Sequence, residues 1–148
     1  MKIKGRYNID INISTMFNNY KLILNEHNLV TNKGVEFIFN KILNNTDDYI
    51  EKIAIGYEKT KPTLTDTFDI LKQPYMQKFD NVNITENEIH FELSMSGDKL
   101  NETSEIGLIT NEKLLVTRDV HDTYDIPVTA SVKIEYILSL TNIGENND

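Results

Sequence analysis

Apolar and polar residues alternate along much of the chain, a pattern typical of strands with one buried face. The longest alternation covers residues 3 to 13, and a shorter one covers residues 20 to 24. Because the two segments are near neighbours, they predict a hairpin with a longish loop. Residues 1 to 28 are therefore either a terminal hairpin of the same subunit or an N-terminal strand arm that pairs with another chain.

The apolar period changes to that of a helix between residues 31 and 44. Val35, Ile38, Phe39, Ile42 and Leu43 recur at the spacing of a helix that is buried on one face. Thr31 stands where an N-cap residue is expected. The pattern predicts one α-helix over about residues 32–44, with this apolar face against the core.

The rest of the chain reads as strands and turns. A short helical turn is expected between Leu64 and Leu71, and a polar tail at residues 141–148 is expected to be flexible. About eight strands and one early helix predict a mainly β fold, an antiparallel β-sandwich with the helix packed on it, as a single domain over residues 1–148. The further strand segments are residues 49–57, 75–85, 88–95, 104–110, 114–120 and 131–140.

Composition and charge narrow the classes of partner. The 148 residues carry a net charge of -8 and include no cysteine, which fits assembly in a reducing cytosol. Basic residues are interleaved with acidic ones, so we expect no nucleic-acid partner. No segment has the roughly 18 consecutive apolar residues of a membrane span, and the N-terminus lacks the pattern of a secretory signal, so we expect no membrane partner either.

Candidate chemistry is sparse. His121, with Asp119, Asp122 and Asp125 nearby, is the most metal-like group, but its spacing matches no known ligand motif, and we interpret it as a structural loop. Acidic pairs such as Asp47 and Asp48 are interpreted as solvated surface. We therefore expect no catalytic residues, no cofactor and no metal.

The segment SEIGLIT, residues 104 to 110, places a carboxylate next to a position without a side chain. Glu105 and Gly107 lie on one face of the predicted strand. Gly107 allows a neighbouring backbone to approach closely. Glu105 can accept backbone N–H groups or pair with Arg118 on the next strand of the hairpin. We interpret the pair as structural rather than catalytic.

Four motifs in a fixed order carry a resemblance to a known family. The matching positions are Asn28, Leu29, Val30, Thr31 and Gly34; Ile55, Gly56, Pro62, Asp66 and Thr67; Glu105, Ile106, Gly107 and Leu108; and Leu114, Leu115, Thr117 (where the family has alanine) and Arg118. Over about residues 28–140 the chain is similar to small tail-associated proteins of bacteriophages and prophages, which include baseplate and neck components and virion-proximal domains of tail fibres. The family pattern departs at Tyr57, Phe68, Ile70, Ile109 and Thr117.

The resemblance implies a virion structural protein without enzymatic activity, made in the cytoplasm of a bacterial host. Its implied partners are other tail proteins and further copies of itself, in a trimer or a hexamer-type ring. Glu105, Gly107, Arg118, Gly56 and Asp66 are the residues we expect to serve structure or an interface. Two alternatives stay open: a carbohydrate- or receptor-binding β-sandwich of a tail fibre, and an enzyme acting on cell-wall glycans through scattered carboxylates.

Overall fold

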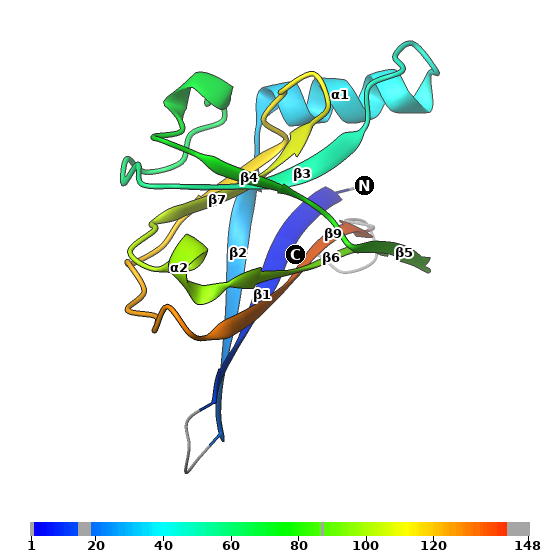
Figure 1. Ribbon diagram of the computed structural model, residues 1–148. Helices are drawn as coiled ribbons and strands as arrows, with labels where there is room; N and C mark the ends of the chain where they lie inside the picture. Colours follow the sequence, from blue (N-terminus) through cyan, green and yellow to red (C-terminus); the bar gives the residue numbers. More distant parts are fainter. Residues whose placement is uncertain (1, 15–18, 87, 142–148) are drawn as a thin grey trace.

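The computed structural model describes residues 2–14, 19–86 and 88–141 (Figure 1). Of the tail expected to be flexible, residues 142–148 lie outside the described residues. The helical elements are α1 (Asn32–Ile42), the 3₁₀-helix η1 (Phe68–Ile70) and α2 (Gly97–Leu100). The strands are β1 (Lys2–Ser14), β2 (Asn19–Val30), β3 (Ile50–Gly56), β4 (Tyr75–Lys78), β5 (Asn81–Thr85), β6 (Glu88–Ser96), β7 (Glu105–Thr110), β8 (Thr117–Val120) and β9 (Ser131–Thr141).

The strands form two antiparallel layers that share one continuous order, β4-β3-β7-β8-β2-β1-β9-β6-β5. The first layer is β4-β3-β7-β8 and the second is β2-β1-β9-β6-β5 (Figure 1). The layers are joined where β2 pairs with β8, through Leu29↔Arg118 and Val30↔Thr117. The predicted mainly β fold, a β-sandwich with one helix packed on it, is confirmed.

The main core lies between the two layers. The first layer contributes four fully buried side chains to this core: Ile53 and Ile55 of β3, and Ile106 and Leu108 of β7. They belong to the same buried cluster as the inward residues of β6 and β9. A smaller cluster on the outer side of the first layer joins Ala54, Ile109 and Leu115 to Leu71, which follows η1. The long connection 57–74 therefore covers the first layer, and η1 lies within the segment where the short helical turn was expected.

The N-terminal segment is a hairpin within the same chain. β1 pairs with β2 on one side and with β9 on the other, so that Gly5 is opposite both Asn28 and Leu138. Figure 1 shows the distal end of this hairpin extending beyond the body of the sandwich. Of the two alternatives for residues 1 to 28, the terminal hairpin is the one observed, and both sides of β1 are paired within the chain.

The predicted buried face of α1 holds for Val35 and Ile38, which are half-buried, and is wrong for its other three residues. Phe37 is buried, whereas Phe39, Ile42 and Leu43 are 57%, 73% and 67% exposed.

The reason for this orientation lies at the start of the helix, where Thr31 is the predicted N-cap and accepts a hydrogen bond from the Gly34 N–H at 2.9 Å. The Thr31 hydroxyl also donates to the Leu115 carbonyl at 2.5 Å, and this contact orients the helix with Gly34 and Phe37 inward.

The predicted strand over residues 75–85 is two strands in different layers. β4 pairs with β3 in the first layer, and β5 pairs with β6 in the second. Asp80 lies at the crossing, where its carboxylate accepts the Ser94 N–H at 2.9 Å and its N–H donates to the Glu92 carbonyl at 2.8 Å. These bonds fix the point at which the chain changes layer, and periodicity alone does not mark it.

Candidate functional site

The most strongly organised polar group is a buried ion pair between β7 and β8. The Arg118 Nε donates to Glu105 Oε1 at 3.0 Å, and neither side chain is exposed to solvent. The two strands are neighbours in the first layer, so the sheet itself presents both side chains to the same space. The pairing expected from the sequence is confirmed.

Glu105 also holds the two ends of the connection 57–74. Its Oε2 accepts the backbone N–H of Glu58 at 2.8 Å and that of Lys72 at 2.9 Å. Gly56 lies opposite Glu105 in the β3–β7 pairing, and a Cβ at Gly56 would lie 2.5 Å from Oε2. Because Gly56 has no side chain, the Glu105 carboxylate can occupy the space beside it.

Arg118 holds the middle of the same connection. Its Nη1 donates to the Thr60 carbonyl at 3.0 Å and to Asp66 Oδ2 at 2.9 Å. Burial raises the pKa of Asp66, but hydrogen bonds from Thr63 and then from Arg118 outweigh it and hold the pKa below its ordinary value. We refer to Gly56, Asp66, Glu105 and Arg118 as the Arg118 cluster.

Gly107 stands beside the Arg118 cluster. A Cβ at this position would lie 2.3 Å from the Thr117 carbonyl oxygen, so a side chain would push β8 away. Four of the five residues singled out from the sequence thus form one cluster, and the fifth packs against the strand that carries Arg118. Their structural role fits this geometry, while a role at an interface stays a prediction.

The Arg118 cluster fastens a loop and is closed to solvent. Both Glu105 oxygens are engaged, and Arg118 and Glu105 are completely buried. Among the described residues, the Arg118 Nη2 has no hydrogen-bond partner. A substrate could reach these groups only if the connection 57–74 opened, so the arrangement suits a permanent fastening.

Sequence reasoning missed part of this network. Thr63 donates from its N–H and its hydroxyl to Asp66, at 3.0 and 2.8 Å, and so orients the carboxylate toward Arg118. The spacing Thr-x-x-Asp is a usable signal for such a turn.

A second buried contact, between the hydroxyls of Thr117 and Tyr136, links the two layers. Burial raises the pKa of Tyr136.

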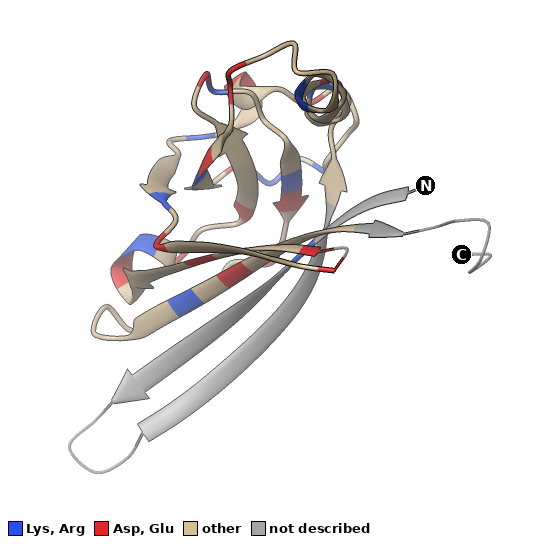
Figure 2. Ribbon diagram, turned by 90° about the vertical axis from the view of Figure 1, so that its right-hand side faces the viewer, with Lys and Arg blue, Asp and Glu red and all other residues tan. Residues whose placement is uncertain are grey.

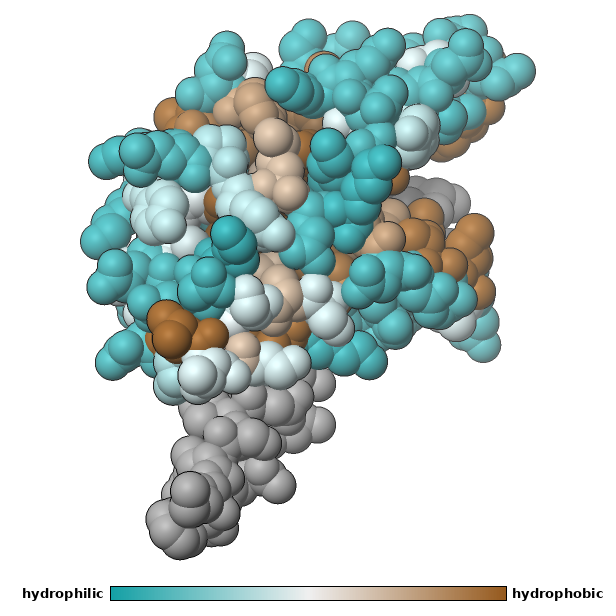
Figure 3. Space-filling model, in the orientation of Figure 1, coloured by the Kyte–Doolittle hydropathy of each residue, from teal (hydrophilic) through white to brown (hydrophobic). Residues whose placement is uncertain are grey.

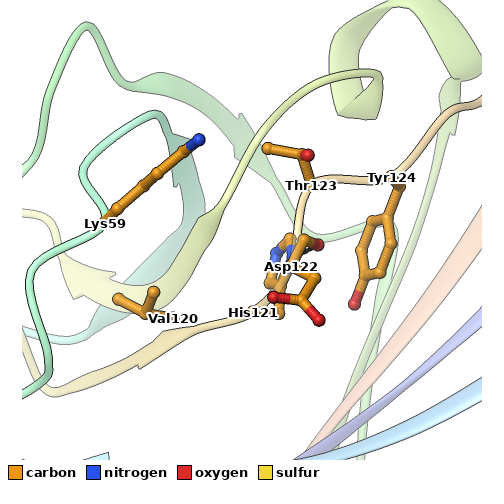
Figure 4. Close-up of a pocket in the computed structure, with 6 residues that line it drawn as sticks. All are labelled: Lys59, Val120, His121, Asp122, Thr123 and Tyr124. Carbon is orange, nitrogen blue, oxygen red and sulfur yellow. Dashed lines mark hydrogen bonds between the residues drawn. The ribbon is translucent and has the colours of Figure 1, made fainter.

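The segment around His121 lines an open pocket of about 760 Å³ together with Lys59 (Figure 4). The His121 ring stacks on Tyr124 with centroids 4.2 Å apart, and its Nδ1 donates to the Asp122 carbonyl at 2.8 Å. In the described part of the chain no group of three or more His, Cys, Asp or Glu side chains could hold a metal ion. Figure 4 shows His121, Asp122, Thr123 and Tyr124 following one another along one loop after Val120, while Lys59 comes from a separate segment, and the side chains do not converge on one point.

An apolar groove of about 460 Å³ separates α1 from the second layer. Its wall is α1 with the start of β3, and its floor comes from β5, β6 and β9. Figure 3 shows apolar surface on both sides of this hollow, on α1 and over β5. The lining residues are Phe37, Ile38, Lys41, Ile42, Tyr49, Ile50, Ile84, Glu86, Glu88, Ile89, Leu138 and Ser139.

Charge around these surfaces is mixed. Figure 2 shows acidic and basic side chains interspersed over the described residues. One ion pair near the groove joins Arg6 of β1 to Glu88 of β6 at 2.9 Å. No described helix has both the length and the apolar character needed to cross a membrane.

Comparison with known proteins gave no match to the chain among protein-family models, curated proteins or solved structures.

Proposed function

We propose that this chain is a non-enzymatic structural component of a bacteriophage or prophage tail, in the baseplate, the neck or a fibre attachment. It acts by self-association and by docking to other virion proteins. The observation that carries the proposal is the convergence of the motif residues on the Arg118 cluster. Gly56, Asp66, Glu105 and Arg118 come from three separate motifs of the resemblance, and the fold brings them into one network.

This convergence gives the motifs a physical reason. A long connection without regular strands needs partners for its backbone groups, because buried N–H and C=O groups are costly when unpaired. Glu105 and Arg118 supply those partners to Glu58, Thr60 and Lys72. Motifs of this kind specify a fold, so the resemblance is better explained by a shared scaffold than by shared chemistry.

The surface supports docking to protein partners. Large apolar side chains are exposed together on α1 and β5, with Ile42 at 73% and Ile84 at 76%, and both line the apolar groove. Exposed apolar patches of this kind mark interaction surfaces in soluble proteins. In this proposal the partners are neighbouring tail proteins and further copies of the chain, in a trimer or a hexamer-type ring, and the chain is located in the virion.

Incorporation into particles tests the proposal directly. Tail-containing particles would be purified on a density gradient from cells that encode the chain, and the chain quantified by mass spectrometry against a major tail protein. We expect it to sediment with the particles at a fixed copy number that is a multiple of three or six. A chain that stays in the soluble fraction while the tail proteins sediment would overturn the proposal.

A further inference from the structure

β5 is an outer strand of the second layer, with β6 as its one neighbour among the described strands. All of its residues are exposed, and its sequence Asn-Val-Asn-Ile-Thr contains neither a charge nor a proline. Natural edge strands usually carry charges, prolines or bulges, because their unpaired backbone groups recruit other strands. β5 lacks this protection over its whole length.

Two rows of apolar side chains run across the second layer and end at β5. In the first row, Leu138 is 7% exposed, Ile89 is half-buried and Ile84 is 76% exposed. The second row shows the same gradient from Tyr136 at 0% through Phe91 at 4% to Val82 at 50%. Each row is buried inside the molecule and uncovered at the edge, so one further strand beside β5 would cover both ends.

We infer that this further strand is β5 of a second copy, paired antiparallel about a twofold axis at Asn83. In this register Val82 lies opposite the partner's Ile84, and Asn81 lies opposite the partner's Thr85. Apolar residues thus meet apolar residues on the groove side, and polar residues meet on the other side. The row that ends at Ile84 continues into the partner's row that ends at Val82, so the segment is complementary to itself.

The contact rests on the self-association in the proposed function and specifies its symmetry. A twofold contact is isologous and builds a dimer, or a hexamer made of three dimers. A trimer that lacks this contact would not agree with it.

Charge sets the conditions under which the contact forms. The same register brings Asp80 near the partner's Glu86 at both ends of the strand pair, and each chain has a net charge of -8. Like charges repel across an interface, and salt screens them over about 10 Å at 0.1 M ionic strength. The dimer should therefore tighten as salt is added. Glu86→Lys should reverse both end contacts and tighten the dimer by about tenfold at low salt.

A disulfide test locates the axis, because the chain has no cysteine of its own. Residues directly opposite in an antiparallel pair have Cα atoms about 4.5–5.5 Å apart, within the range of a disulfide. Asn83→Cys should give a covalent dimer under mild oxidation. Asn81→Cys is the matched control on the same exposed strand, since its two thiols would be four residues, about 13 Å, apart. Equal crosslinking of both variants, or of neither, would overturn the inference.

The mass in solution gives an independent readout by size exclusion with light scattering. The unmodified chain should approach twice its 17.1 kDa mass as concentration and salt rise. Ile84→Lys should remain monomeric, while Val128→Lys, at a loop position that is 65% exposed, should still dimerise. Unchanged circular dichroism would show that Ile84→Lys is folded, and a folded Ile84→Lys that still dimerises would overturn the contact.

The two proposals can fail separately. If Asn83→Cys crosslinks but the chain is absent from purified particles, the contact stands and the virion function falls. If the chain is found in particles while neither cysteine variant crosslinks there or in solution, the function stands and the β5 contact falls.

Discussion

Arg118 and Glu105 face each other from neighbouring strands, with Nε and Oε1 3.0 Å apart and both side chains fully buried. In a buried ion pair, each charge offsets the cost of removing the other from water, so the loss of either side chain destabilises the fold. Removing one partner leaves an uncompensated charge inside the protein, and here it would also release the connection 57–74.

A double-mutant cycle should reveal this dependence. We expect Glu105→Gln and Arg118→Met each to lower the free energy of unfolding by about 3–5 kcal/mol. The double variant should lose less than the sum by about 1 kcal/mol or more, because the second change no longer strands a charge. Urea unfolding measures each value, and strictly additive losses would contradict the coupling.

Gly107→Ala should destabilise the first layer. The added Cβ would lie 2.3 Å from the Thr117 carbonyl oxygen, and backbone atoms cannot move aside as a flexible side chain can. Overpacking of this kind costs about 1–3 kcal/mol. For a chain of this length we expect a melting temperature lower by more than about 3 °C. Ser94→Ala, at an exposed position of β6, is the control and should melt like the parent.

Thr31 supports both the start of α1 and its orientation. Thr31→Ala removes the acceptor for the Gly34 N–H and the donor to the Leu115 carbonyl, so we expect a loss of about 1–2 kcal/mol in unfolding free energy. Thr31→Ser keeps the hydroxyl and should recover most of the loss. If chemical denaturation shows the two variants equally unstable, the hydroxyl is not the stabilising group.

Acid should weaken the protein partly through Asp66. Its pKa in the folded chain is lower than the ordinary value of 3.8, so folding favours its ionised form. The resulting stabilisation is fully present above about pH 4 and is lost as the pH falls through the folded-state pKa.

Asp66→Asn should therefore be less stable than the parent at neutral pH, with the difference shrinking below about pH 4. Asp69→Asn removes a charge from an exposed position of the same connection and is the control. Unfolding curves recorded from pH 2 to 7 would measure both. A difference for Asp66→Asn that is constant with pH would count against the role of its charge.

Alternation predicted most of the strands because inward and outward positions differ in burial along a sandwich. It also predicted the Glu105–Arg118 pair, since a short hairpin places its strands side by side. The apolar pattern of α1 did not identify the buried face, because apolar residues occur on more than one side of the helix and only one side is buried. Phe37 lies inward, while Ile42 with the same chemical character lies in solvent.

The change of layer after β4 had no signal in the periodicity. It depends on hydrogen bonds between Asp80 and β6, which come from residues distant in sequence. The network around Arg118 shows the same limit. The sequence indicates that Glu105 can accept hydrogen bonds. The path of the connection 57–74 determines that the donors are the backbone N–H groups of Glu58 and Lys72.

The pairing of β1 with β9 determines the order in which the chain can fold during synthesis. β1 leaves the ribosome well before β9, yet their register runs from Lys2↔Thr141 to Asn12↔Ser131. The second layer therefore cannot close until β9 has been made, and until then β1 has β2 alone as a neighbour among the described strands. Pairings between such distant segments are slow to form and leave strand edges open in the meantime. The edge of the β1–β2 hairpin that receives β9 thus stays unpaired until β9 has been made.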